Sequence, residues 1–114
     1  MKRLDLQDQD PLEVELDRGQ NILLDPTHDG LRCYSYKTKS NTEALIKLQD
    51  LMARKQPSSQ GHDTAYFNLA GVEASVNITN GGIMVIQFYF RERTDEVVTK
   101  ITEFCTLLQE VGII

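Results

Sequence analysis

The sequence predicts an α+β fold in which two β-β-β-α halves share one six-stranded antiparallel sheet and pack both helices on one face of it. Two segments that lie 53 residues apart have the same helical spacing of apolar residues, and three strand-like runs precede each of them. A unit of about 50 residues covers its sheet only partly with one helix, so two units side by side make a more complete core. We expect halves over about residues 11–55 and 64–111 of a single domain, residues 1–114, with an exposed polar linker over residues 56–63.

The first half begins with three predicted strands. In residues 12–16, LEVEL, apolar and acidic side chains alternate, as in a strand with one buried face. Residues 21–25 and 31–37 form the next two predicted strands. Asp29-Gly30 lies between them, and this dipeptide is a strong signal for a hairpin turn. The first half therefore supplies three strands before its helix.

The first predicted helix spans residues 41–55. Ser40 and Glu43 match the S-x-x-E pattern of a capping box, which satisfies backbone N–H groups at a helix start. The apolar side chains that follow have the spacing of one face of an α-helix, so this helix is expected to pack on the sheet along that face.

Three further strands are predicted in the second half, over residues 65–69, 72–79 and 83–90. In residues 72–79 apolar and polar side chains alternate strictly, which assigns one face to the core and one to water. The tripeptide Asn-Gly-Gly at residues 80–82 predicts the hairpin turn into the last strand.

The second predicted helix spans residues 95–110 and follows the cap residue Thr94. It repeats the apolar positions of the first helix in the pairs Ala44 with Val97, Leu45 with Val98, Leu48 with Ile101, Leu51 with Phe104, and Met52 with Cys105. Two amphipathic helices often share a phase by chance. The middle strands fit an offset of 52 about as well as one of 53. Because strands, caps and turns repeat together with the helices, we interpret the chain as a tandem duplication.

Charge is unevenly distributed along the chain, and the net charge is −5. The first 17 residues carry six acids and two bases, whereas residues 32–55 carry six bases and two acids. Affinity for nucleic-acid backbones comes from clustered cations, so the net charge disfavours a nucleic-acid binder but leaves room for a local basic patch. No apolar run approaches the roughly 18 residues of a membrane span, and the N-terminus lacks the pattern of a secretory signal. These features predict a soluble cytoplasmic protein with no membrane contact.

The sequence offers little for catalysis or metal binding. Cys33 and Cys105 are too few for a disulfide scaffold and are predicted to be buried thiols. His28 and His62 fall in separate loops, with no Cys, His or carboxylate at the spacing of a zinc site. We therefore predict no catalytic residue, no metal site and no cofactor.

The outer face of the sheet is the predicted working surface. The strand over residues 83–90 is apolar almost throughout, and its inward side chains are expected to be Met84, Ile86, Phe88 and Phe90. The expected outward side chains are Ile83, Val85 and Tyr89, together with Arg32, Tyr34 and Tyr36 of the first half. Either a terminal segment or a second subunit covers this surface, or the surface recognises a partner. Self-association satisfies both interpretations.

We therefore predict a non-enzymatic protein-binding or regulatory module, of the kind represented by inhibitors, immunity or antitoxin-like proteins and assembly adaptors, and we expect a homodimer. The predicted partner-binding residues are Tyr34, Tyr36, Val85 and Tyr89. Tyrosines suit this role because they offer a large contact area. The acidic N-terminal segment is an alternative contact surface.

Single-stranded nucleic-acid binding is the alternative function. In this alternative the tyrosines would stack on bases of the nucleic acid, and basic side chains would contact its phosphates. The basic residues are Arg32 and the pairs that follow the third strand of each half, Lys37, Lys39, Arg91 and Arg93. An enzyme that uses the DPTHDG turn of residues 25–30 is a third reading, although a genuine active site needs a second converging element and the sequence shows none.

Overall fold

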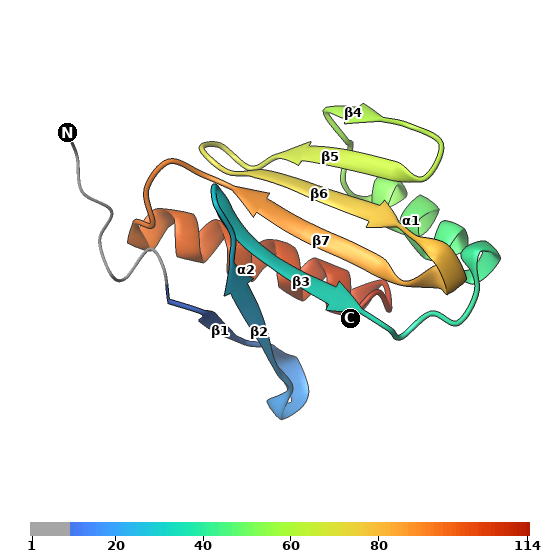
Figure 1. Cartoon of the computed structure of the whole chain (residues 1–114), viewed down its shortest axis with the longest axis horizontal. Helices are drawn as coiled ribbons and strands as arrows, with labels where there is room; N and C mark the ends of the chain where they lie inside the picture. Colours follow the sequence, from blue (N-terminus) through green and yellow to red (C-terminus); the bar gives the residue numbers. More distant parts are fainter. Residues whose placement is uncertain (1–9) are drawn as a thin grey trace.

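A computed structural model describes residues 10–114 and shows an α+β fold with a seven-stranded antiparallel sheet and two helices (Figure 1). The strands are β1 (Leu12–Glu15), β2 (Asn21–Pro26), β3 (Gly30–Ser35), β4 (Ser59–Gln60), β5 (Thr64–Asn68), β6 (Glu73–Ile78) and β7 (Met84–Tyr89). The helices are α1 (Asn41–Arg54) and α2 (Asp95–Glu110), and short 3-10 turns occur at Asp17–Gly19 and Asn80–Gly82.

The sheet has the strand order β1-β2-β3-β7-β6-β5-β4, so the strands of each half are neighbours and β3 meets β7 in the centre. The β3–β7 ladder is antiparallel and sets Cys33 opposite Ile86. Both helices lie behind the sheet in Figure 1, on the same side of it. Within residues 10–114, neither helix combines the length and hydrophobicity that crossing a bilayer requires.

The seventh strand is a departure from the six strands that the sequence predicts. It is β4, which lies inside the segment expected to be a plain linker and pairs Ser59 with Tyr66 and Gln60 with Ala65. Both β4 residues are exposed, so backbone hydrogen bonds rather than burial hold the strand. Alternating hydrophobicity could not reveal it, because neither Ser59 nor Gln60 is apolar.

The helix boundaries agree with the predicted ones to within one residue. The hydroxyl of Ser40 accepts a hydrogen bond from the Glu43 N–H at 3.1 Å, and Thr94 caps α2 in the same way. The Glu43 carboxylate accepts from the N–H of Lys39 at 3.0 Å, one residue before the cap. The predicted caps therefore fix where both helices begin.

The core lies between the sheet and the two helices. Met84, Ile86 and Phe88 of β7 are fully buried, as their alternation predicts, whereas Phe90 is only half-buried. Phe104 of α2 packs with its ring centroid 5.1 Å from that of Phe67 and 5.9 Å from that of Phe88. These tilted and edge-to-face contacts fix α2 against β5 and β7.

The turn between β6 and β7 is attached to the start of α1. Gly82 has a φ of +84°, which favours glycine, and a β-carbon there would lie 2.4 Å from the carbonyl oxygen of Ser40. The Gly82 N–H donates to the side-chain oxygen of Asn41 at 2.8 Å, and the Gly82 carbonyl accepts from the buried hydroxyl of Thr38 at 2.6 Å. The turn of the second half and the helix of the first therefore hold each other in place.

Candidate functional site

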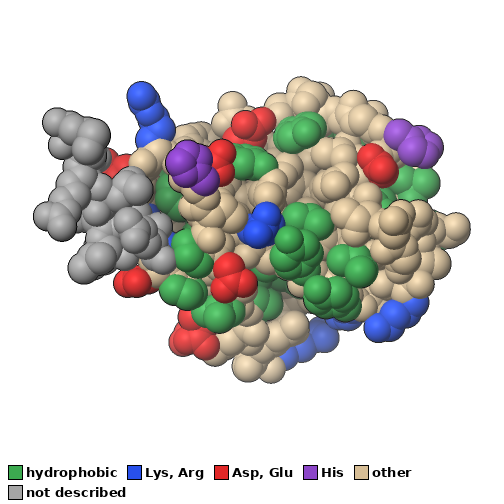
Figure 2. Space-filling view, in the orientation of Figure 1, with side chains coloured by type: hydrophobic (Ala, Val, Ile, Leu, Met, Phe, Trp, Pro, Cys, Tyr) green, Lys and Arg blue, Asp and Glu red, His purple; other side chains and the backbone are tan. Residues whose placement is uncertain are grey.

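The sheet face that points away from the helices is the candidate site, and we call it the open face. Its outward residues on β3, β5 and β7, with Tyr36 just beyond β3, are Arg32, Tyr34, Tyr36, Tyr66, Val85, Gln87 and Tyr89. No helix of residues 10–114 covers it, and Figure 2 shows hydrophobic side chains gathered over the strands on this side. The exposed fractions are 47% for Tyr34 and 61% for Tyr36. The face therefore presents aromatic surface to the outside.

The register of β3 and β7 determines which outward side chains are neighbours. Tyr34 lies opposite Val85, and Arg32 lies opposite Gln87. The guanidinium carbon of Arg32 lies 5.3 Å from the ring centroid of Tyr34, within the range of a cation–π contact. The hydroxyl of Tyr89 donates a hydrogen bond to the side-chain oxygen of Gln87. The centre of the open face is thus a contiguous aromatic and polar surface.

The predicted partner-binding residues differ in exposure. Tyr34 and Tyr36 are exposed, while Val85 and Tyr89 are half-buried, as is Ile83. The neighbouring strands β3 and β6 flank β7 and limit its exposure, whereas Tyr36 lies beyond the end of β3. The tyrosines of the first half therefore provide most of the accessible aromatic surface.

Two exposed apolar residues of the sheet were not among the predicted site residues. Tyr66 of β5 is 37% exposed and lies opposite Ser75, which in turn lies opposite Gln87 of the open face. Leu23 of β2 is 55% exposed and lies opposite Glu13 of β1. The alternation in residues 65–69 already pointed Tyr66 outward, so that signal could have found it.

The predicted basic residues do not come together. Because β3 and β7 are antiparallel, Lys37 and Lys39 follow one end of their ladder, and Arg91 and Arg93 follow the other. Five residue steps separate the ends, which corresponds to roughly 17 Å. Lys39 donates to the carbonyl of Tyr36 at 3.0 Å, Lys37 donates to the carbonyl of Ile114 at 3.4 Å, and Arg93 donates to the carbonyl of Asp10.

The two cysteines are buried and free. Burial, and secondarily the nearby Asp25 carboxylate, raises the pKa of Cys33 to about 12. Burial also raises the pKa of Cys105 strongly, and the Cys33 thiol adds to that effect. Both groups are therefore neutral thiols near pH 7, a state that lacks the nucleophilicity of a thiolate.

The DPTHDG turn joins β2 to β3. Asp25, His28 and Asp29 are all exposed, and the Thr27 N–H donates to the Gly30 carbonyl at 2.8 Å across the turn. His62 lies in a different exposed loop. Among residues 10–114, no three His, Cys, Asp or Glu side chains come together as a set that could hold a metal ion. The turn between β2 and β3 is by itself a sufficient reason for these polar residues, because turns favour such residue types.

The acidic N-terminal segment is only partly described, because residues 1–9 lie outside the described residues. Its later acids, Asp10, Glu13, Glu15 and Asp17, are exposed.

Comparisons with models of protein families, with curated proteins and with solved structures each returned no match. Any functional proposal therefore depends on the chain's own residues.

Proposed function

We propose that this protein is a small non-enzymatic binding module whose open face contacts another protein. The observation that carries the proposal is the exposure of Tyr34 and Tyr36 on a sheet face that no helix of the described chain covers. Tyrosine is enriched at protein interfaces because it provides a large, amphipathic contact at small entropic cost. Inhibitors, immunity or antitoxin-like proteins and assembly adaptors are the classes of protein that act through such contacts alone.

The partner that we propose first is a second copy of the chain. An antiparallel sheet with one side open to water ordinarily shows polar side chains there, whereas the open face presents Tyr34, Tyr66 and Val85. Pairing two such faces would bury this aromatic surface in both copies. The neutral, buried thiols support a non-enzymatic role and, as free cysteines, a cytoplasmic location.

Sedimentation of three proteins tests this proposal. We expect the wild type to dimerise at micromolar concentration and Tyr34→Glu to remain a folded monomer, because the interface would lose an aromatic contact and would have to desolvate a carboxylate together with the neighbouring Arg32. Ile46→Glu is the matched control, since Ile46 is 53% exposed on α1, away from the open face. A wild type that is monomeric at every concentration would end the self-association proposal. Equal dimerisation of all three proteins would place the interface elsewhere.

Single-stranded nucleic-acid binding remains the alternative, supported by the stacking of Arg32 near Tyr34 and by the nearby Lys37 and Lys39. The net charge of −5 and the distant position of Arg91 and Arg93 count against it. A mobility shift of an unstructured oligonucleotide at about 50 mM salt checks this function, because even non-specific binders have Kd values of about 10⁻⁴–10⁻⁶ M. No shift with micromolar protein would remove the alternative.

We also infer that the two halves descend from one duplicated β-β-β-α unit. The offset of 53 residues that relates the helices also relates Cys33 to Ile86, and these two residues lie opposite each other in the central ladder. Residues related by a local two-fold axis through an antiparallel ladder meet in this way. The order of β1-β2-β3 and of β5-β6-β7 around the centre supports the same interpretation.

A further inference from the structure

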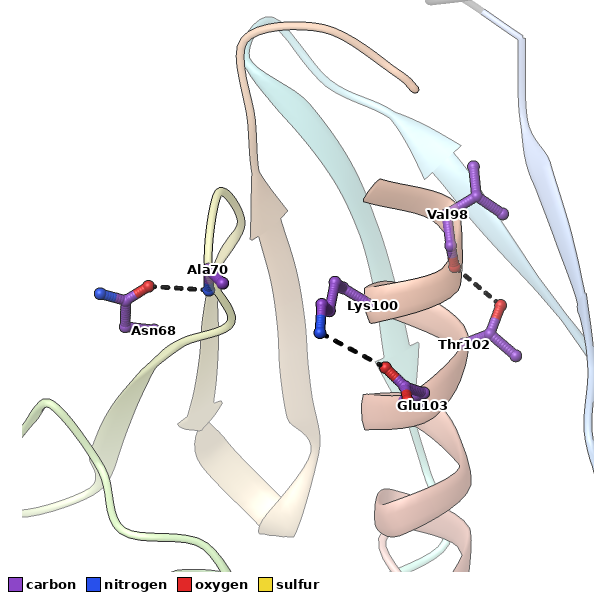
Figure 3. A network of polar contacts seen from close by, with 6 residues as sticks. All are labelled: Asn68, Ala70, Val98, Lys100, Thr102 and Glu103. Carbon is purple, nitrogen blue, oxygen red and sulfur yellow. Dashed lines mark hydrogen bonds and ion pairs between the residues drawn. The ribbon is translucent and has the colours of Figure 1, made fainter. Parts of the chain in front are cut away.

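A hollow of about 410 Å³ lies on the helix side of the sheet, and none of the residues that line it belongs to the open face. Three elements form it: the end of α1 at Lys55, the turn between β5 and β6, and the middle of α2. Its volume falls within the range of about 300–1,000 Å³ that small-molecule sites occupy. Figure 3 shows Lys100 extending from α2 toward the turn that carries Ala70.

The floor of the hollow is apolar. Leu69 and Phe104 are buried and Leu107 is half-buried, and all three line the hollow. Phe104 is the side chain that packs against Phe67 and Phe88, so the core holds this floor rigidly. An occupant with a hydrocarbon part would be excluded from water along this surface.

The rim of the hollow carries more positive than negative charge. Lys55 and Lys100 line it together with a single carboxylate, that of Glu103. The Lys100 ammonium lies 4.0 Å from the Glu103 carboxylate, and the two side chains are 37% and 65% exposed. A surface pair at that separation is weak, so a second carboxylate can take the place of Glu103. Among the described residues, no ion pair engages Lys55.

The third wall is a backbone turn in an unusual conformation. Ala70 has a φ of +60° and Gly71 a φ of +104°, while the Leu69 N–H donates to the Val72 carbonyl at 2.8 Å. The Asn68 side chain accepts from the Ala70 N–H at 3.0 Å and so supports the turn (Figure 3). Positive φ is costly for alanine, and strained residues of this kind cluster at ligand sites.

We propose that this hollow binds a small amphipathic carboxylate, a medium-chain alkanoate, with its carboxylate between Lys55 and Lys100 and its hydrocarbon chain on Leu69, Phe104 and Leu107. The charge of the rim selects an anion, and the floor selects an apolar chain. The hollow and the open face share no residue, so this proposal and the proposed protein contact stand or fall separately.

Titration of the whole chain with octanoate, followed by 1H–15N NMR, tests the proposal. We expect shift changes concentrated at the amides of residues 68–71 and 100–107, and little effect from acetate, which lacks the chain, or from octyltrimethylammonium, which has the opposite charge. Changes confined to the open face, or equal binding of the cationic amphiphile, would overturn it.

Charge variants provide the second measurement. The double variant Lys55→Gln with Lys100→Gln should raise the Kd for octanoate at least fivefold, while Glu103→Gln should lower it at least twofold because the competing carboxylate is gone. Lys47→Gln is the matched control and should leave the Kd within twofold, since Lys47 does not line the hollow. An unchanged Kd in the double variant would refute the proposal, and all of these substitutions are at partly or fully exposed positions.

Discussion

Gly30 lies so close to Phe88 that a β-carbon on Gly30 would stand 1.7 Å from the Phe88 carbonyl oxygen. The contact joins the first residue of β3 to β7, at the end of the central ladder. The obstructing atom belongs to the backbone of a buried strand, so it cannot move aside as a flexible side chain would. Glycine is required at this position for close approach rather than for an unusual φ.

We expect Gly30→Ala to lower the free energy of unfolding by about 3 kcal/mol or more, because the added methyl group forces the two central strands apart. Urea denaturation measures the change. Gly61→Ala is the matched control, since a β-carbon on Gly61 meets nothing within 4 Å, and it should change stability by less than about 0.5 kcal/mol. Equal effects of the two substitutions would contradict the close contact.

At the strained turn, by contrast, we expect a substitution of Ala70 to increase the free energy of unfolding. Ala70→Gly should raise the free energy of unfolding by about 0.5–1 kcal/mol, because glycine adopts a φ of +60° without the steric cost that alanine bears. The same substitution at Ala53, an exposed residue in the last turn of α1, should instead lower it, by up to about 1 kcal/mol. Thermal unfolding of both variants compares them directly. A destabilised Ala70→Gly would show that the turn is unstrained.

Leu48 of α1 and Ile101 of α2 are both almost completely buried and correspond under the 53-residue offset. Truncation of either to alanine should cost about 2–4 kcal/mol, the usual range for a buried aliphatic side chain. Chemical denaturation provides the comparison. A loss of several kcal/mol at one site with less than about 0.5 kcal/mol at the other would argue against equivalent halves.

The buried thiols predict a loss of stability at alkaline pH. The pKa of Cys33 is about 12 in the folded chain and about 8.5 when exposed, so the unfolded chain releases this proton first. Below about pH 8.5 the thiol has no effect, and above it unfolding becomes easier by up to about 1.4 kcal/mol per pH unit. Denaturation of wild type and Cys33→Ala between pH 7 and 10 gives the difference. Parallel pH profiles of the two proteins would mean that Cys33 ionises while folded.

The sequence was sufficient to predict the helices and the main strands. Ser40 and Thr94 cap the helices where expected, and the alternation around Phe88 assigned the buried face of β7. These signals are local, so one sequence reveals them. The pairing of β3 with β7 is not a local feature of the sequence. This antiparallel pairing places Lys39 and Arg91 at opposite ends of the ladder.

The hollow beside Ala70 could not be found from the sequence for a similar reason. It requires Lys55 and Lys100 to converge from different helices, which depends on how each helix packs on the sheet. Gly71 marks the turn between β5 and β6 in the sequence, but alanine does not signal a positive φ, so the strained position at Ala70 could not be recognised. Likewise, Ser59 and Gln60 of β4 carry no apolar pattern.

The central ladder has a consequence for how the chain folds. The hairpins join strands that follow one another closely and close within microseconds, whereas Cys33 and Ile86 must meet across 53 positions. Closing so long a loop costs conformational entropy before the stabilising contacts between β3 and β7 can form. We expect joining of the two half-sheets at β3 and β7 to limit the folding rate. Until they join, each half exposes an unpaired apolar edge that is open to aggregation with other chains.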